Sequence, residues 1–191
     1  MERLDAVIHR IDQLNAADPN LEMNEGRSEP AALPYGQRMS AILAEFASAP
    51  SEHLKIAVRG QHIERWKRLR SDYPEGRIGY LQWRRDAAKY HAERVAELMK
   101  SEGYDDDACA RTASLIRKER LKIDREAQLL EDVAALVFMR WYFAPFAPGR
   151  PQEELFQIVK KTAIKMSAEG RKAALKLPLP AALVPAILSA D

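Results

Sequence analysis

Three side chains that can bind a metal ion or move a proton lie where helices should face a core. His62, His91 and Asp132 each fall within the apolar stripe of a separate predicted helix, because residues three, four and seven apart share one side of a helix. Glu119 stands at the end of the apolar face of a fourth helix. Two histidines and one or two carboxylates from separate helices suit a divalent metal such as Zn, Mn, Fe or Ni.

The same pattern has a second interpretation. A buried ionisable side chain is costly unless it is paired or bound to a metal. Asp132 could pair with His91 or with an arginine, and the cluster would then hold helices together without a metal. Ion-pair networks of this kind resemble functional sites in their pattern. The residues alone leave both a metal or catalytic site and a structural network open.

A basic segment runs from Arg59 to Arg85, with eight Lys and Arg against three acids in a chain of net charge +2. Arginine offers paired donors to phosphate or carboxylate, and aromatic rings offer stacking faces to a base. A solvated basic face with ordinary core aromatics is the alternative. The segment predicts a site for a small anionic, nucleotide-like ligand, whose candidate residues are Arg65, Trp66, Tyr73, Arg77, Trp83 and Arg84.

Composition favours a globular helical protein in a reducing compartment. The chain has 191 residues, of which 47% are hydrophobic and 30% charged, and only 8 are glycine. Cys109 is its single cysteine, so no disulfide can form within the chain. The charged start of the sequence is unlike a signal peptide, and no apolar run approaches the roughly 20 residues of a membrane helix. We therefore expect a cytoplasmic protein with no membrane contact.

Hydrophobic spacing predicts an all-α fold, a single compact domain over 1–191 with about eight helices. We expect loops at 16–34 and 71–79, and an apolar tail at 178–191 that docks as a last helical turn. The third helix is expected from Ser51 to about Leu69. Side chains that can cap helix starts stand at four places, namely Ser51, Asp105, Asp124 and Ser167.

Three segments of the sequence stand out, reading HLKIAVRGQHIERW, YPEGRIGYLQWRR and LEDVAALVF. In these segments the chain resembles the domain-of-unknown-function family 4202, and the resemblance covers nearly the whole chain. Some members carry the label glutamyl-tRNA synthetase, although the nucleotide motifs of a synthetase are not present in this sequence. The resemblance implies a compact helical domain and supplies no established activity.

A remoter similarity is to the HD-domain superfamily of helical metal-dependent phosphohydrolases. That similarity implies His91 and Asp132 as metal ligands. Two cations, one of them Lys118, stand where the His-Asp pair of the superfamily should follow. Either His62 and Glu119 replace the lost ligands, or the site has no metal and Lys118 is a counter-ion for Asp132 or for a substrate anion.

The leading prediction is a divergent HD-like domain that binds a nucleotide or phosphate and hydrolyses it as a metal-dependent phosphohydrolase. A metal-bound water would be the nucleophile, and Lys118 and Asp132 would be catalytic. Arg65, Arg84 and Lys118 would stabilise the charge of the transition state. The alternative is a non-catalytic binding or accessory module, which would contact RNA or an acidic protein through the basic aromatic face or dock its tail on a partner.

Overall fold

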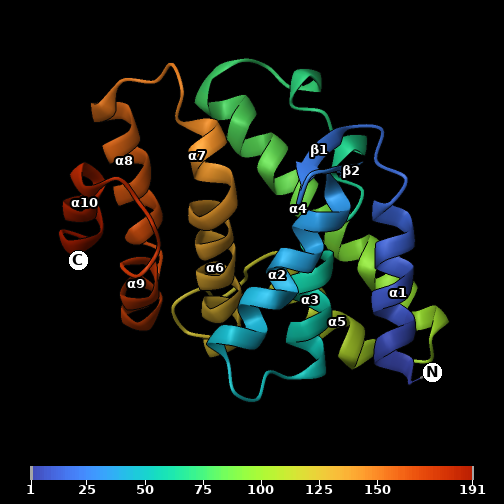
Figure 1. Ribbon diagram of the computed structural model, residues 1–191. Coiled ribbons are helices and arrows are strands. Elements are labelled where there is room, and N and C mark those ends of the chain that lie inside the picture. Colours follow the sequence, from blue (N-terminus) through green and yellow to red (C-terminus); the bar gives the residue numbers. More distant parts are fainter. Residues whose placement is uncertain (1, 191) are drawn as a thin grey trace. The chain divides into compact units, whose positions relative to one another are not determined.

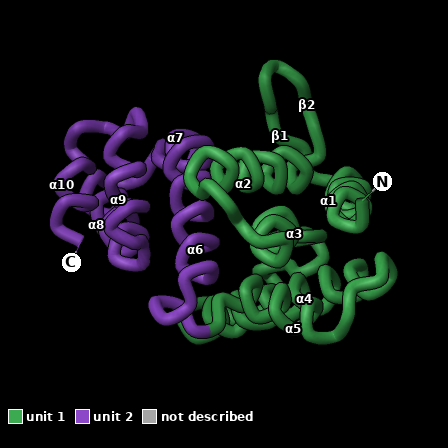
Figure 2. Tube along the Cα trace, turned by 90° about the horizontal axis from the view of Figure 1, so that it is seen from below, with its two compact units in different colours: residues 1–119 green, residues 120–191 purple. Residues whose placement is uncertain are grey.

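Helices make up nearly the whole of the computed structural model, which describes residues 2–190 (Figure 1). The all-α prediction is therefore confirmed, with one small hairpin added. The chain divides into two compact units, residues 1–119 and 120–191 (Figure 2). The single domain expected from the sequence stays a prediction, and each unit has a core of its own.

The first unit is arranged around α3. Its elements are α1 (Arg3–Asn15), β1 (Leu21–Asn24), β2 (Arg27–Pro30), α2 (Ala32–Phe46), α3 (Glu52–Gly60), α4 (Gly76–Ser101) and α5 (Asp106–Ile116). Helix α3 contacts α1, α2, α4 and α5. Its side chains Leu54, Ile56 and Val58 are fully buried, because a helix enclosed on several sides must be apolar on more than one face.

The four predicted helix caps are confirmed. The hydroxyl of Ser51 accepts a hydrogen bond from the Leu54 amide, and the other three side chains cap their helices in the same way, namely Asp105, Asp124 and Ser167. Such caps depend only on residues close in sequence, since they satisfy amide groups in the first helical turn. They are therefore readable without knowledge of tertiary structure.

The prediction that the third helix continues to Leu69 is wrong. Helix α3 ends at Gly60, and two short 3-10 turns follow, at Arg65–Lys67 and Arg70–Asp72. Glu64, four residues beyond the end of α3, has a left-handed φ of +50°, so the helix does not resume through it. The expected apolar stripe therefore does not form, and Leu69 is 52% exposed. The loop predicted at 71–79 is shorter than expected, because α4 already begins at Gly76.

The loop predicted at 16–34 contains a hairpin and the start of α2. Strands β1 and β2 pair in antiparallel register, with Asn24 opposite Arg27. The two turn residues between them, Glu25 and Gly26, both have positive φ, as the twist of a two-residue hairpin requires. Arg38 of α2 donates to Glu22 at 2.6 Å and to Asn24 at 2.9 Å. Leu21 and Met23 alternate with polar residues in β1, but that stretch is only four residues long and β2 has no such alternation, so periodicity gave only a weak signal for the hairpin.

The second unit is a smaller group of helices. It contains α6 (Arg125–Val137), a π-helical turn (Phe138–Tyr142), α7 (Phe143–Phe146), α8 (Gln152–Ala163), α9 (Ala168–Ala174), a 3-10 turn (Ala181–Leu183) and α10 (Val184–Leu188). Helix α6 contacts α9, and α10 contacts both α8 and α9. Across residues 2–190, no helix is both long and apolar enough to cross a bilayer.

The described part of the predicted tail, 178–190, packs within its own unit. Leu183, Ala186 and Ile187 are buried, and α10 lies against α8. Leu188, on the other side of the short helix, is 64% exposed. The buried side of the tail is therefore occupied, which argues against its use as a docking segment for a partner.

We expect Ile187→Ala to lower the free energy of unfolding by about 2–4 kcal/mol, because it leaves a cavity under α10. Leu188→Ala is the matched control and should change it by less than about 0.5 kcal/mol. Urea unfolding followed by circular dichroism measures both. Equal losses in the two variants would contradict the observed packing of the tail.

Candidate functional site

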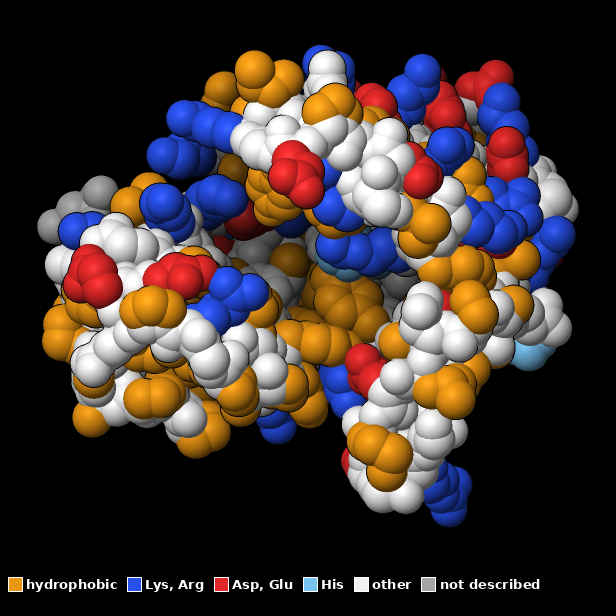
Figure 3. All heavy atoms as spheres, turned by 90° about the horizontal axis from the view of Figure 1, so that it is seen from above, with side chains coloured by type: hydrophobic (Ala, Val, Ile, Leu, Met, Phe, Trp, Pro, Cys, Tyr) orange, Lys and Arg blue, Asp and Glu red, His pale blue; other side chains and the backbone are white. Residues whose placement is uncertain are grey.

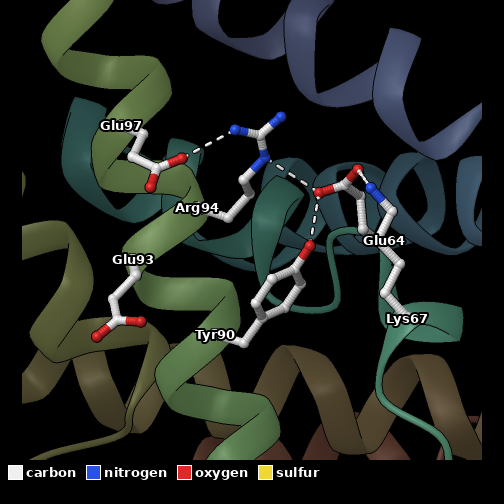
Figure 4. A pocket seen from close by; sticks show the side chains of 6 residues that line it. All are labelled: Glu64, Lys67, Tyr90, Glu93, Arg94 and Glu97. Carbon is white, nitrogen blue, oxygen red and sulfur yellow. Dashed lines mark hydrogen bonds and ion pairs between the residues drawn. The ribbon is translucent and has the colours of Figure 1, made fainter.

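Hydrogen bonds from three side chains hold Glu64, which lies in the segment that joins α3 to α4 (Figure 4). It is 2% exposed, and its carboxylate accepts from Lys67 Nζ at 2.5 Å, the Tyr90 hydroxyl at 2.9 Å and Arg94 Nε at 3.0 Å. Burial alone would raise its pKa, but the bonds from Lys67 and Tyr90 and the charge of Arg94 hold that pKa below its ordinary value. Glu64 is therefore an anion whose donors come from its own turn and from α4.

The backbone of Glu64 is held as firmly as its side chain. Its amide donates to Oδ1 of the buried Asn15 in α1 at 3.1 Å. A left-handed conformation costs a residue other than glycine about 1–2 kcal/mol, and here these hydrogen bonds offset that cost. The chain reverses at Glu64 and places the residues on either side of it, His62 and Arg65, on the same part of the surface.

His91 of α4 is a neutral histidine with a defined tautomer. It is 2% exposed, and its Nδ1 lies 2.7 Å from the carbonyl oxygen of Ile63. A carbonyl can only accept, so Nδ1 carries the hydrogen. Burial lowers the pKa of His91 to about 4. Its Nε2 therefore keeps a lone pair at neutral pH, which allows that atom to accept a proton or a hydrogen bond.

His62 lies half-buried between α2 and α4. Its ring stacks on Tyr35 with centroids 4.7 Å apart, and the ring of His91 is 5.8 Å away. Burial is the largest cause that lowers the pKa of His62 well below 6.5. The next causes are all basic side chains, in the order Arg65, His91, Lys118 and Arg84. His62 is therefore uncharged and lies within a cluster of positive groups.

The arginines of this cluster face rings instead of carboxylates. Arg65 Nη1 lies 3.1 Å from each ring nitrogen of His62, and the Arg65 guanidinium carbon is 5.1 Å from the ring centroid of Trp83. The guanidinium carbon of Arg84 is 5.8 Å from the ring centroid of Tyr80. Within the described part of the chain, neither arginine forms an ion pair. Their charge is thus available to a ligand.

Half of the ligand residues predicted from the basic segment meet at this cluster, namely Arg65, Trp83 and Arg84. The others have different surroundings. The Tyr73 hydroxyl donates to Asp86 at 3.2 Å, and Arg77 is exposed in the first turn of α4. Trp66 is half-buried in a 3-10 turn. The charge of Lys118, which was predicted as catalytic, contributes to the lowered pKa of His62, after burial, Arg65 and His91.

The four predicted metal ligands are divided between different places. His62 and His91 are neighbours, but Glu119 is exposed and pairs with Arg117 at 2.6 Å. Asp132 belongs to the second unit. Among residues 2–190, no three His, Cys, Asp or Glu side chains form a group that could hold a metal ion. Two histidines surrounded by basic groups do not fit the donor set of a divalent metal.

Asp132 has a structural role in its own unit. Its carboxylate accepts from the Ser167 amide at 2.8 Å, the Ser167 hydroxyl at 2.5 Å and Gln128 Nε2 at 3.1 Å. Burial raises its pKa, although the bonds from Ser167 and Gln128 oppose that shift. A Cβ at Gly170 would lie 2.7 Å from the carboxylate. Asp132 thus anchors the start of α9 to α6 through Ser167 and Gln128, which are not the His91 or arginine partners considered from the sequence.

Sequence reasoning missed several residues of the site. Tyr35, which stacks on His62, and the buried Glu64 belong to no sequence motif that marks a site. Gln61, whose Nε2 donates to the Tyr35 hydroxyl at 3.1 Å, gave no periodic signal. Tyr90 precedes His91 directly, which is the one local signal that could have drawn attention to it. Burial is the main cause that raises the pKa of Cys109, and the nearby acids contribute less.

We expect Asp132→Ala to lower the free energy of unfolding by about 2–4 kcal/mol, because three partly buried donors lose their buried acceptor. Asp132→Asn keeps one acceptor oxygen, so its loss should be about half as large. Thermal and urea unfolding of both variants test this. An Asp132→Ala variant as stable as the parent would show that the cap of α9 does not depend on Asp132.

Comparison with known proteins identifies one family and no individual relative. No curated protein and no solved structure matches the chain. One family model matches residues 5–187, nearly the full length. The chain therefore belongs to the family described as Domain of unknown function (DUF4202).

Proposed function

We propose that the first unit binds a small phosphorylated ligand at the cluster formed by His62, Arg65, Arg84, His91 and Lys118. The observation that carries the proposal is the position of two arginines against uncharged rings: Arg65 Nη1 lies 3.1 Å from each ring nitrogen of His62, and the guanidinium carbon of Arg84 lies 5.8 Å from the Tyr80 ring centroid. The four charged or titratable groups with the largest influence on the pKa of His62 are all basic. Cations gathered at a half-buried position repel one another, and a bound anion removes that repulsion.

Carboxylates of the same segment do not supply the missing negative charge. Glu64 is the nearest acid in sequence, but Lys67, Tyr90 and Arg94 already occupy its carboxylate. Guanidinium groups bind phosphate oxygens through paired donors, whereas a lone metal ion or a cationic ligand would add to the repulsion. An anionic ligand is the class that this charge distribution favours.

The aromatic rings at the cluster support a ligand with a flat group beside its phosphate. Arg65 lies against Trp83, Arg84 lies against Tyr80, and the rings of Tyr80 and Trp83 are 5.9 Å apart. Tyr80 is 43% exposed. Exposed rings next to arginine are suited to stack on a nucleobase, so a nucleotide is the form of ligand that we test first.

Hydrolysis of a phosphate ester is a second candidate, favoured by the tautomer of His91. Because Nδ1 donates to Ile63, Nε2 can take a proton from a water whose oxygen attacks phosphorus. The alcohol of the ester would leave with its bonding electrons. The HD-like fold and the divalent metal stay predictions, and the same is true of non-catalytic binding of RNA or an acidic protein.

We expect nucleoside 5′-phosphates and inorganic phosphate to bind, and Arg65→Ala to weaken that binding about tenfold or more, since a charged hydrogen bond contributes about 1.5–3 kcal/mol. Arg27→Ala, an exposed arginine next to the hairpin turn, is the matched control and should leave affinity within about twofold. Isothermal titration calorimetry measures both. Equal losses in the two variants would indicate general attraction to a basic surface and contradict a specific site.

We expect sulfate to bind more tightly as the pH falls from 7 to 5. In the free protein the pKa of His62 is depressed, and that of His91 is about 4. A bound anion raises both values, so binding takes up protons and is favoured at lower pH. Sulfate does not titrate in this range. Calorimetry in buffers of different ionisation enthalpy gives the proton uptake, and affinity that does not change with pH would contradict contact with the histidines.

A further inference from the structure

The first three turns of α4 stand out from the first unit as an exposed basic and apolar helix. Ile78 is 75% exposed and Leu81 is 52% exposed, and most of their neighbours up to Asp86 are exposed as well. On the opposite side, Gly79 is buried against Pro74 and Trp83 is half-buried. This part of α4 therefore presents a face that no other described part of the chain covers.

Apolar and basic residues share that face. Ile78 and Leu81 are three residues apart, and Arg85 continues the same side of the helix at seven residues from Ile78. The side chain of Arg85 is 77% exposed, and its one carboxylate neighbour is the adjacent Asp86, at 3.8 Å. Arg77 is exposed beside Ile78. We call these four residues, Arg77, Ile78, Leu81 and Arg85, the α4 patch.

Leu69, in the segment that precedes α4, is a further exposed aliphatic side chain. It is 52% exposed, and the residues on either side of it are bonded to α4 or its first turn. Trp83 Nε1 donates to the Arg68 carbonyl at 2.8 Å, and Arg70 donates to the Gly76 carbonyl at 3.3 Å. Figure 3 looks onto this end of the molecule and shows hydrophobic and basic side chains exposed side by side. Neighbouring exposed aliphatic side chains of this kind mark interaction sites.

We infer that the α4 patch docks an acidic amphipathic helix of a partner protein. Ile78 and Leu81 fit the apolar stripe of such a helix, and Arg77 and Arg85 fit carboxylates on its flanks. A second copy of this chain would bring four patch arginines together, which like-charge repulsion opposes. Nucleic acid would pair with the arginines but leave both aliphatic side chains in water. Charge and apolar surface together therefore favour the acidic helix.

The test uses the full chain and a synthetic peptide of about 20 residues, with leucines at alternating spacings of three and four and glutamates on both flanks. Fluorescence anisotropy measures its binding to the parent, to the double variant Ile78→Ser with Leu81→Ser, and to Arg85→Ala. Ile123→Ser is the matched control, because Ile123 is 77% exposed in the second unit. Two further peptides carry lysines in place of glutamates, or the same residues with the leucine spacing shuffled.

We expect the acidic peptide to bind the parent. The double variant should weaken that binding about tenfold and Arg85→Ala about threefold, whereas Ile123→Ser should have no effect. Failure of the acidic peptide to bind, or equal binding of the shuffled peptide, would overturn the proposal. So would flotation of the chain with phosphatidylserine vesicles that depends on Ile78 and Leu81, which would indicate a membrane surface. Dimerisation that depends on the same residues would instead indicate a second copy.

Discussion

A buried carboxylate needs donors, and the donors of Glu64 determine how the segment between α3 and α4 runs. Lys67 comes from the same turn, whereas Tyr90 and Arg94 come from two successive turns of α4. The segment must therefore lie along α4 for the charge to be satisfied. Removing the donors would leave a buried anion, which costs more than the left-handed backbone that Glu64 adopts.

Two neighbouring parts of this segment, at Glu64 and at His62, differ in the charges that surround them. Around Glu64 the positive and negative groups balance, so that side of the segment is held in place. Around His62 the side chains that lower its pKa are all basic. The network at Glu64 thus gives the proposed ligand site a fixed neighbour on the same segment.

The features that could be predicted from the sequence depend on residues that are close together along the chain. Helix caps such as Ser51 depend on amides one turn away, and they were found. The closeness of His62 and His91 was also expected, but from a helix continuing past Gly60, where α3 in fact ends. The left-handed turn that follows is held by a bond from Glu64 to Asn15, 49 residues away. Asp132 was correctly expected to be buried, yet its partner Ser167 lies 35 residues further on. No pattern within one helix reveals such partners.

The contact between Gly79 and Pro74 has a consequence for how the sequence can vary. A Cβ at position 79 would lie 1.9 Å from the carbonyl oxygen of Pro74, so every residue other than glycine would push the segment away from the helix. Residues on either side of Gly79 are exposed and should accept many substitutions. A saturation library would thus show one intolerant position within a permissive stretch of α4. The intolerance at Gly79 would arise from its contact with Pro74 and not from a requirement of helix formation.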